Sequence, residues 1–302
     1  MAGGPQGTWT TTTDQAIPTQ WSVSTGKNIR WKTELPEGGQ SGIAIWGDRL
    51  FLSINKPLPL NTPLEKAEGS DIVGYCLDAN TGKLIWTVEI PSPKTMPYSG
   101  LFSDNTSATP ITDGKRVWFI NQGGSMACFT MEGKLVWTRP FESRTRHNAK
   151  QCEPILVDDQ LLFVLMRDPN DPLRREMKAK SGNRESPAKD WPWTFIRSFD
   201  ANTGKPLWTE PTGTSVHNTP RLGYLDGEPY VFHGRGGGHV PPEMPYGFSM
   251  SKVGGENLWN YESKGTVTYT VAHFDSQHAY GFDRGSLMKF DARNGTVVAK
   301  FP

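Results

Sequence analysis

The chain has 302 residues, and its 32 Lys and Arg nearly balance its 31 Asp and Glu, for a net charge of +1 at pH 7. No block of like charges is present, so the charge pattern favours neither a nucleic acid nor a charged membrane surface as partner. The chain lacks the apolar run of roughly 18 residues that a transmembrane helix needs, and Met1–Gln6 lacks the basic and apolar regions of a signal peptide. Its 32 Gly, 24 Pro and 11 Trp favour many short strands joined by tight turns over packed helices.

One short motif recurs along the chain. Its two fullest copies, Asp78–Trp86 and Asp200–Trp208, share the order Asp-Ala-Asn-Thr-Gly-Lys and end on a tryptophan. The degenerate copies are, in chain order, Thr25–Trp31, Met131–Trp137, Val253–Trp259 and Asp291–Val298. Successive tryptophans are 55, 51, 71 and 51 residues apart, which is typical of propeller blades with one insertion. The period predicts an all-β chain, a β-propeller of four-stranded antiparallel blades.

The motif has the residues of a tight turn that leads into a strand. Its Asp and Asn can bond to their own backbone, and its Gly allows a positive φ. A tryptophan on the last strand of a blade can dock on the neighbouring blade and bury a large area there. We therefore expect structural docking, and not ligand stacking, from Trp31, Trp86, Trp137, Trp208 and Trp259.

Residues 104–142 can be divided into one complete blade. Its strands are expected at residues 108–111, 116–120, 126–129 and 135–138. Alternation along the third strand predicts that equivalent residues of four blades face the core, namely Leu77, Phe129, Phe199 and Phe290. Cys76 and Cys128 occupy the same position in consecutive blades, and with Cys152 they form no CxxC pair, so all three are expected to be buried thiols.

Aligned on this motif, residues 1–302 form a single propeller domain with five blades. The blades are expected at about residues 39–92, 104–142, 146–211, 214–263 and 266–302. The strand at 25–35 stands alone before them. Either the chain is a fragment of a propeller of six to eight blades, which ring closure favours, or this strand joins a complete blade as a fifth strand.

The Asp-x-x-Thr-Gly-x-x-x-Trp motif of Asp78–Trp86 and Asp200–Trp208 resembles the repeat of the pyrroloquinoline quinone (PQQ) family of β-propellers. The resemblance covers about residues 25–301 and implies a protein of the periplasm or the cell exterior. That family includes quinoprotein alcohol and sugar dehydrogenases as well as non-catalytic members such as the outer-membrane assembly lipoprotein.

The resemblance also implies PQQ and Ca²⁺ as cofactors of the dehydrogenase branch. Those enzymes have adjacent cysteines over the quinone, with carboxylate and amide ligands for Ca²⁺. This chain has no Cys-Cys pair, and Glu153 is the clearest carboxylate near a predicted strand start. No cofactor or metal site is therefore assigned from the sequence.

Polar residues at the starts of the innermost strands of a propeller converge on its axial channel, although they are distant in sequence. The candidates here are Gln40, Asn105, His147, Asn148, Gln151, His217, Asn218, Tyr269 and His273. Such groups either bind channel water and cap strand ends or hold a ligand. His147 and His217 have the chemistry of general bases or metal ligands, but no third ligand lies at a fixed spacing from them.

Two functions agree with these features. The first is a non-catalytic binding or scaffold propeller that presents loops such as 167–192 and 234–245 to a protein or polysaccharide partner. The second is an enzyme, either a quinone-dependent oxidoreductase or a carbohydrate-active propeller that uses the channel histidines and Tyr269. The missing catalytic signatures favour the first.

Overall fold

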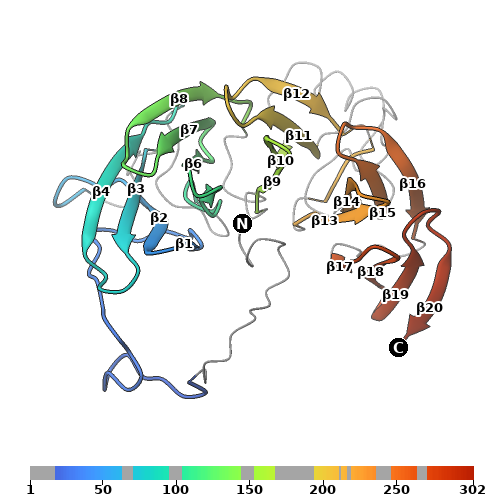
Figure 1. Ribbon diagram of the computed structural model, residues 1–302, viewed down its shortest axis with the longest axis horizontal. Coiled ribbons are helices and arrows are strands. Elements are labelled where there is room, and N and C mark those ends of the chain that lie inside the picture. Colours follow the sequence, from blue (N-terminus) through green and yellow to red (C-terminus); the bar gives the residue numbers. More distant parts are fainter. Residues whose placement is uncertain are drawn as a thin grey trace. The chain divides into compact units, whose positions relative to one another are not determined.

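The computed structural model describes residues 18–62, 71–94, 104–143, 153–166, 194–210, 212–215, 219–235, 246–263 and 271–302. Over these ranges the chain forms strands and turns, with no helix that could cross a membrane. Figure 1 shows the strands in chain order, each sheet built from consecutive strands. The chain divides into two compact units, with the main boundary after Thr138.

The first unit contains two four-stranded sheets. The first sheet has the order β1 (Ala44–Trp46), β2 (Arg49–Asn55), β3 (Ile72–Asp78) and β4 (Leu84–Ile90). The second has the order β5 (Ile111–Thr112), β6 (Arg116–Asn121), β7 (Ser125–Thr130) and β8 (Leu135–Pro140), and β8 runs across the boundary. Residues 25–35, where the sequence predicts a lone strand, belong to no sheet of the described chain.

The second unit contains three more sheets of four strands. The third sheet consists of β9 (Ile155–Val157), β10 (Gln160–Met166), β11 (Thr194–Asp200) and β12 (Pro206–Thr209). The fourth consists of β13 (Arg221–Leu225), β14 (Glu228–Arg235), β15 (Gly247–Lys252) and β16 (Asn257–Glu262). The fifth consists of β17 (Val271–Phe274), β18 (His278–Asp283), β19 (Ser286–Asp291) and β20 (Val297–Phe301). The predicted architecture of five four-stranded antiparallel sheets is confirmed.

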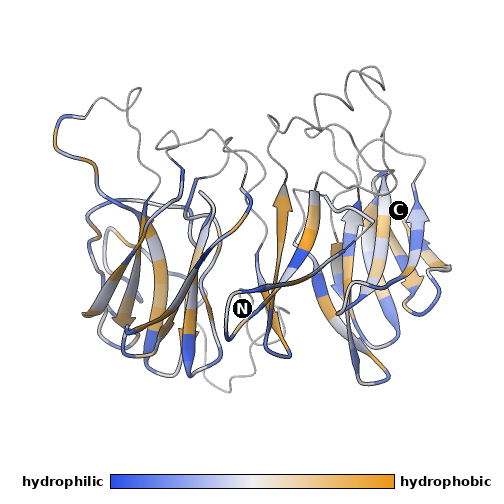
Figure 2. Cartoon of the chain, turned by 90° about the horizontal axis from the view of Figure 1, so that it is seen from above, coloured by the Kyte–Doolittle hydropathy of each residue, from blue (hydrophilic) through white to orange (hydrophobic). Residues whose placement is uncertain are grey.

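The sheets of each unit pack through large apolar side chains placed on small residues. In the first unit the Phe119 ring lies so close to Gly74 that a Cβ there would meet it at 2.7 Å. In the second, a Cβ on Gly281 would meet Phe248 at 2.5 Å. Figure 2 shows apolar residues along the strands of the sheets. The close approach explains why the strands carry glycine at these positions despite its cost in a sheet.

The third strands β3, β7, β11 and β15 are buried on both faces over most of their length, whereas β19 alternates between buried and half-buried residues. Leu77, Phe129, Phe199 and Phe290 are buried as the alternation predicts. Cys76 and Cys128 alternate with two of them and are fully buried as well. A sheet packed between two neighbours has no solvent face, so simple alternation underestimates the burial. Burial raises the pKa of the Cys128 thiol to about 12, which makes it an inert core thiol, while Cys152 lies outside the described residues.

The repeated motif forms the turn between the third and fourth strands. In its first copy, Asp78 Oδ1 accepts hydrogen bonds from Asn80 N–H at 2.9 Å and from Thr81 N–H at 2.8 Å. Gly82 then adopts φ +71°, a left-handed conformation that favours glycine. Asp200 makes the equivalent bonds in its own copy.

Tryptophans of the motif contact the turn of the next sheet. Trp86 Nε1 donates to the carbonyl of Met131 at 3.0 Å, and Trp259 Nε1 donates to the carbonyl of Ala292 at 2.8 Å. Trp31 makes the equivalent bond to the Ala79 carbonyl at 3.0 Å, which holds residues 25–35 against the first sheet. Trp208 differs, because its Nε1 donates to Gln160 of its own sheet at 2.7 Å.

Candidate functional site

The last residue of the second strand is a recurrent polar contact point within each unit. Asn121, at the end of β6, donates from Nδ2 to the carbonyl of Ile90, the last residue of β4, at 2.9 Å. Asp283, at the end of β18, accepts a hydrogen bond from Ser263, just after β16, at 2.6 Å. Because each contact joins a second strand to the exit of the preceding outer strand, these polar groups connect neighbouring sheets.

The first unit has a buried polar cluster around Asp104. Its Oδ1 accepts hydrogen bonds from Thr106 N–H at 2.8 Å and from the Thr106 hydroxyl at 2.6 Å. Its Oδ2 accepts from Asn55 Nδ2 at 3.1 Å, at the end of β2. Thr106 Oγ1 in turn accepts from Gln40 N–H at 2.7 Å. The cluster therefore joins the segment before β1 to the segment before β5 with one carboxylate and neutral partners.

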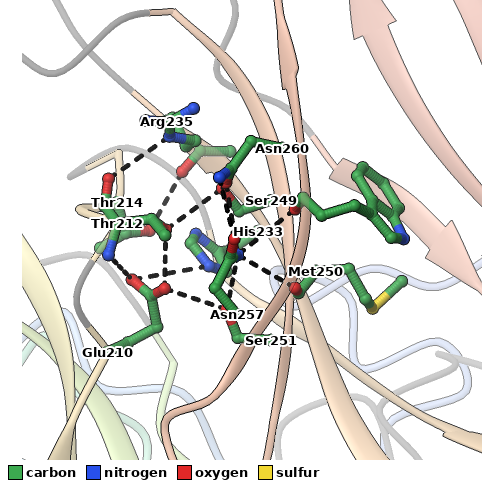
Figure 3. Close-up of polar contacts among 12 residues, drawn as sticks. Glu210, Thr212, Thr214, His233, Arg235, Ser249, Met250, Ser251, Asn257 and Asn260 are labelled. Carbon is green, nitrogen blue, oxygen red and sulfur yellow. Dashed lines mark hydrogen bonds and ion pairs between the residues drawn. The ribbon is translucent and has the colours of Figure 1, made fainter. Parts of the chain in front are cut away.

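The second unit has a buried cluster around Glu210, which directly follows β12 (Figure 3). Its carboxylate accepts hydrogen bonds from Thr212 N–H at 3.0 Å and from the Thr212 hydroxyl at 2.6 Å. It also accepts from the Ser251 hydroxyl on β15 at 2.9 Å. Ser249, on the same strand, bonds to Thr212 at 3.2 Å and to Asn260 on β16 at 2.5 Å. This network joins the third sheet to the fourth.

Two nitrogen-bearing side chains of β14 complete the second cluster. His233 is fully buried, and its Nε2 lies 3.8 Å from Glu210 Oε2. Arg235, at the end of the strand, is 5% exposed and donates from Nε to the Thr212 carbonyl at 3.3 Å. Burial lowers the pKa of His233 below its ordinary value, and the carboxylate of Glu210 only partly offsets this. The imidazole is therefore neutral at pH 7 beside a buried carboxylate and a guanidinium.

The structure describes three of the nine residues predicted for an axial channel. Gln40 is exposed, and its Oε1 accepts hydrogen bonds from Asp104 N–H at 3.2 Å and Ser107 Oγ at 3.1 Å. Asn105 is buried beside this cluster, and its carbonyl accepts from Gln122 N–H at 2.9 Å. The structure thus brings Gln40 and Asn105 together in the first unit.

His273 lies in the second unit, exposed on β17, with its ring 6.1 Å from that of Tyr280. The other predicted channel residues fall outside the described residues, namely His147, Asn148, Gln151, His217, Asn218 and Tyr269. The convergence of the channel histidines therefore stays a prediction.

Sequence reasoning missed the carboxylates at the centres of the two buried clusters, Asp104 and Glu210. Asp104 and Glu210 each stand two residues before a threonine, in the segment that connects one sheet to the next. This carboxylate-x-Thr pattern was the available signal. The sequence carries no such signal for His233, because a single histidine next to the apolar residues of β14 is not distinguished from an ordinary core residue.

The described residues do not fit the cofactor set of a quinoprotein dehydrogenase. The chain has no pair of adjacent cysteines, and Cys76 and Cys128 lie in sheet interiors. Over the described ranges, no three His, Cys, Asp or Glu side chains gather as metal ligands. The buried carboxylates Asp104 and Glu210 are already occupied by hydrogen bonds from their own units.

Comparison with protein families finds a match to part of the chain. A family model described as outer membrane protein assembly factor BamB matches residues 64–185. The match covers less than half of the chain and shows that this segment is similar to that family. The matched segment includes the full motif copy at Asp78–Trp86 and the copy at Met131–Trp137. No curated protein matches the chain.

Solved structures of β-propellers have the same fold as this chain. BamB from Moraxella catarrhalis is 15% identical, with a TM-score of 0.51 over 90% of this chain and 64% of that one. A europium-containing methanol dehydrogenase is 11% identical, with a TM-score of 0.51 over 88% of this chain and 50% of that one.

A quinohemoprotein alcohol dehydrogenase from Comamonas testosteroni is 12% identical, with a TM-score of 0.51 over 87% of this chain and 43% of that one. The chain thus spans less than two thirds of each of these three structures. At such identities the likeness shows the fold alone: the five sheets are propeller blades.

Proposed function

We propose that this PQQ-like propeller is a non-catalytic binding or scaffold module for a protein partner. The observation that carries the proposal is the use of its buried carboxylates. Asp104, Glu210 and Asp283 all accept hydrogen bonds that join neighbouring sheets or the segments between them. A carboxylate used in this way stabilises the blade arrangement and is not free for acid–base chemistry. The match to a family described as an outer membrane protein assembly factor supports a protein as partner.

The partner-binding surface in this proposal consists of the predicted loops 167–192 and 234–245. Gly234 and Arg235 are instead the buried end of β14, and the other residues of both loops lie outside the described residues. Both loops connect the second strand of a blade to the third, in the consecutive sheets that contain β10 and β14. Long loops on a rigid β scaffold are the usual carriers of binding function. A polysaccharide partner is the other form of the same proposal. By family resemblance we place this activity in the periplasm or the cell exterior.

The five motif tryptophans are structural docking residues in this proposal. Trp31, Trp86 and Trp259 each place an indole N–H on the carbonyl of the neighbouring turn. A Cβ on Gly82 would meet the Trp31 ring at 2.4 Å, and one on Gly295 would meet the Trp259 ring at 2.6 Å. Rings held this closely have no open face on that side for a ligand.

A crosslinking experiment tests the binding role. A photo-crosslinking amino acid at Val240, within the proposed loop, is compared with one at Lys83, in an exposed motif turn. We expect Val240 to capture a defined protein that Lys83 does not capture. That protein, once purified, should bind the chain at least tenfold more weakly when residues 236–245 are replaced by a short Gly-Ser linker. Equal capture at both positions, or unchanged affinity after loop replacement, would contradict the proposal.

A catalytic assay tests the absence of enzyme activity. The chain is incubated with PQQ and Ca²⁺, and reduction of a dye is measured with alcohol and sugar substrates. We expect no turnover above that of the cofactors alone. Turnover that is lost in the variants His147→Ala or His217→Ala would favour a quinone-dependent oxidoreductase instead. Cleavage of a polysaccharide, lost in Tyr269→Phe, would favour the carbohydrate-active alternative.

A further inference from the structure

His233 is a buried imidazole, and neither of its nitrogens makes a hydrogen bond of ordinary geometry to the described residues, although the Gly234 backbone lies near enough to act on the ring. It lies on β14, where it pairs with Ser249 of β15, and the side chain is completely enclosed. Its nearest charged neighbour is Glu210 of the segment after β12, 3.8 Å away. In folded proteins nearly all buried polar groups form hydrogen bonds. A buried imidazole without such a bond therefore lowers the stability of the packing around it.

Charged and polar side chains from neighbouring strands surround His233 (Figure 3). From the third sheet comes Glu210, and from its own strand comes Arg235. Glu262, the last residue of β16, acts on Arg235. The groups that β15 and β16 contribute to the network are neutral hydroxyls and amides, namely Ser249, Ser251, Asn257 and Asn260.

The hydrogen bonds of Glu210 limit how far its carboxylate can move toward a second cation. Its carboxylate already accepts from Thr212 and Ser251, and these bonds fix its position between the two sheets. A protonated His233 would place a positive charge close to that of Arg235, in a site from which water is excluded. Glu210 is the buried carboxylate beside these two cations, whereas Glu262 is exposed to solvent. Since two buried cations and one buried carboxylate are poorly balanced, separation of the sheets would hydrate the excess charge.

We propose that the contact between the third and fourth sheets, built from Glu210, His233 and Arg235, is an acid-sensitive seam that opens when His233 is protonated. Opening here means separation of the β12 exit from β14 and β15, which exposes the cluster to water. This acid-sensitive opening does not depend on the proposed partner binding. It would make residues 212–215, which follow Glu210, respond to the acidity of their surroundings.

The direction of the pH effect follows from the burial of the imidazole. Burial holds the pKa of His233 below the ordinary value of 6.5, so the closed seam binds its proton less readily than the open seam does. Well above pH 6.5 neither state is protonated, and the seam keeps its full stability. As the pH falls below 6.5, the open state gains a proton that the closed state lacks, and closure weakens.

Hydrogen exchange of the whole chain, read by mass spectrometry at pH 7.5 and 5.5, tests the proposal. After correction for intrinsic exchange rates, we expect the opening constant of peptides from β12 and β14 to rise up to about tenfold at the lower pH. The variant His233→Gln should lose this rise. The control variant His273→Gln, which removes an exposed histidine from β17, should keep it.

An equal rise in wild type and His233→Gln would overturn the proposal. If His233→Gln does not fold, the wild-type chain still decides the question. A rise confined to peptides from β12, β14 and β15, with β2 and β3 of the first unit unchanged, supports the seam. No rise, or the same rise in both units, overturns it.

Discussion

Two buried carboxylates, one in each unit, are held by the same local device in different electrostatic surroundings. Asp104 in the first unit and Glu210 in the second each accept the N–H and the hydroxyl of the threonine two residues later. Asp104 is further bonded by the neutral amide of Asn55, which ends β2. Glu210 lies instead beside the strand that ends on Arg235 and contains His233. The second strand beside each carboxylate therefore sets its surroundings. The strand β2 offers Asp104 a neutral amide, whereas β14 places two ionisable side chains near Glu210.

The largest expected effect is at Glu210. Glu210→Ala removes the carboxylate that balances Arg235 and leaves Thr212 and Ser251 without their acceptor. Breaking such a buried charge arrangement costs about 3–5 kcal/mol of unfolding free energy. Urea denaturation at pH 7.5 measures it. Glu210→Gln keeps an acceptor oxygen and should fall between wild type and alanine, and a loss below about 1 kcal/mol for the alanine variant would contradict the electrostatic account.

A smaller effect is expected at Asp104. Asp104→Ala removes the acceptor for Thr106 and Asn55, but no buried cation is left behind. The loss of these hydrogen bonds should cost about 2–3 kcal/mol, measured by the same denaturation. Asp104→Asn is the matched control, because it keeps one acceptor oxygen and should cost less. If Asp104→Ala costs more than Glu210→Ala, the proposed difference between the two clusters is wrong.

The smallest effect is expected where the two units are alike. Trp86→Phe in the first unit and Trp259→Phe in the second each remove an indole N–H that donates to the carbonyl of the next turn. Each should lower the unfolding free energy by about 1–2 kcal/mol, from the hydrogen bond and some ring contact. The two losses should agree within about 1 kcal/mol, as measured by thermal or urea unfolding. A much larger loss in one unit would show that the motif does not play the same part in both.

Much of the fold could be predicted because its signals are local. The motif copies at Asp78–Trp86 and Asp200–Trp208 contain the turn residues and the strand residues in one short segment. Their Asp side chains make the expected bonds to the backbone two and three residues later. The spacing of the motif copies then predicted the length of each blade, and blades of that length have four strands.

The buried clusters were harder to predict because they depend on residues far apart in the chain. Gln40 was predicted at a strand start, yet its partners are Asp104 and Ser107, more than sixty residues away. His233 and Glu210 are joined only when β14 packs against the exit of β12. Neither residue has a local pattern that distinguishes it from an ordinary core or turn position.

The amino-acid sequence by itself determined the all-β class, the blade period and the conformation of the motif turns, because these depend on residues within one turn or one strand pair of each other. The tertiary structure alone decided which polar residues are buried and what faces them. Asn55 and Arg235 both end a second strand, but one lies in a cluster with Asp104 and the other in the network of Glu210 and His233. The reason is physical: burial removes water as the alternative partner, and the strength of the remaining interactions depends on the groups that neighbouring sheets bring within a few ångströms.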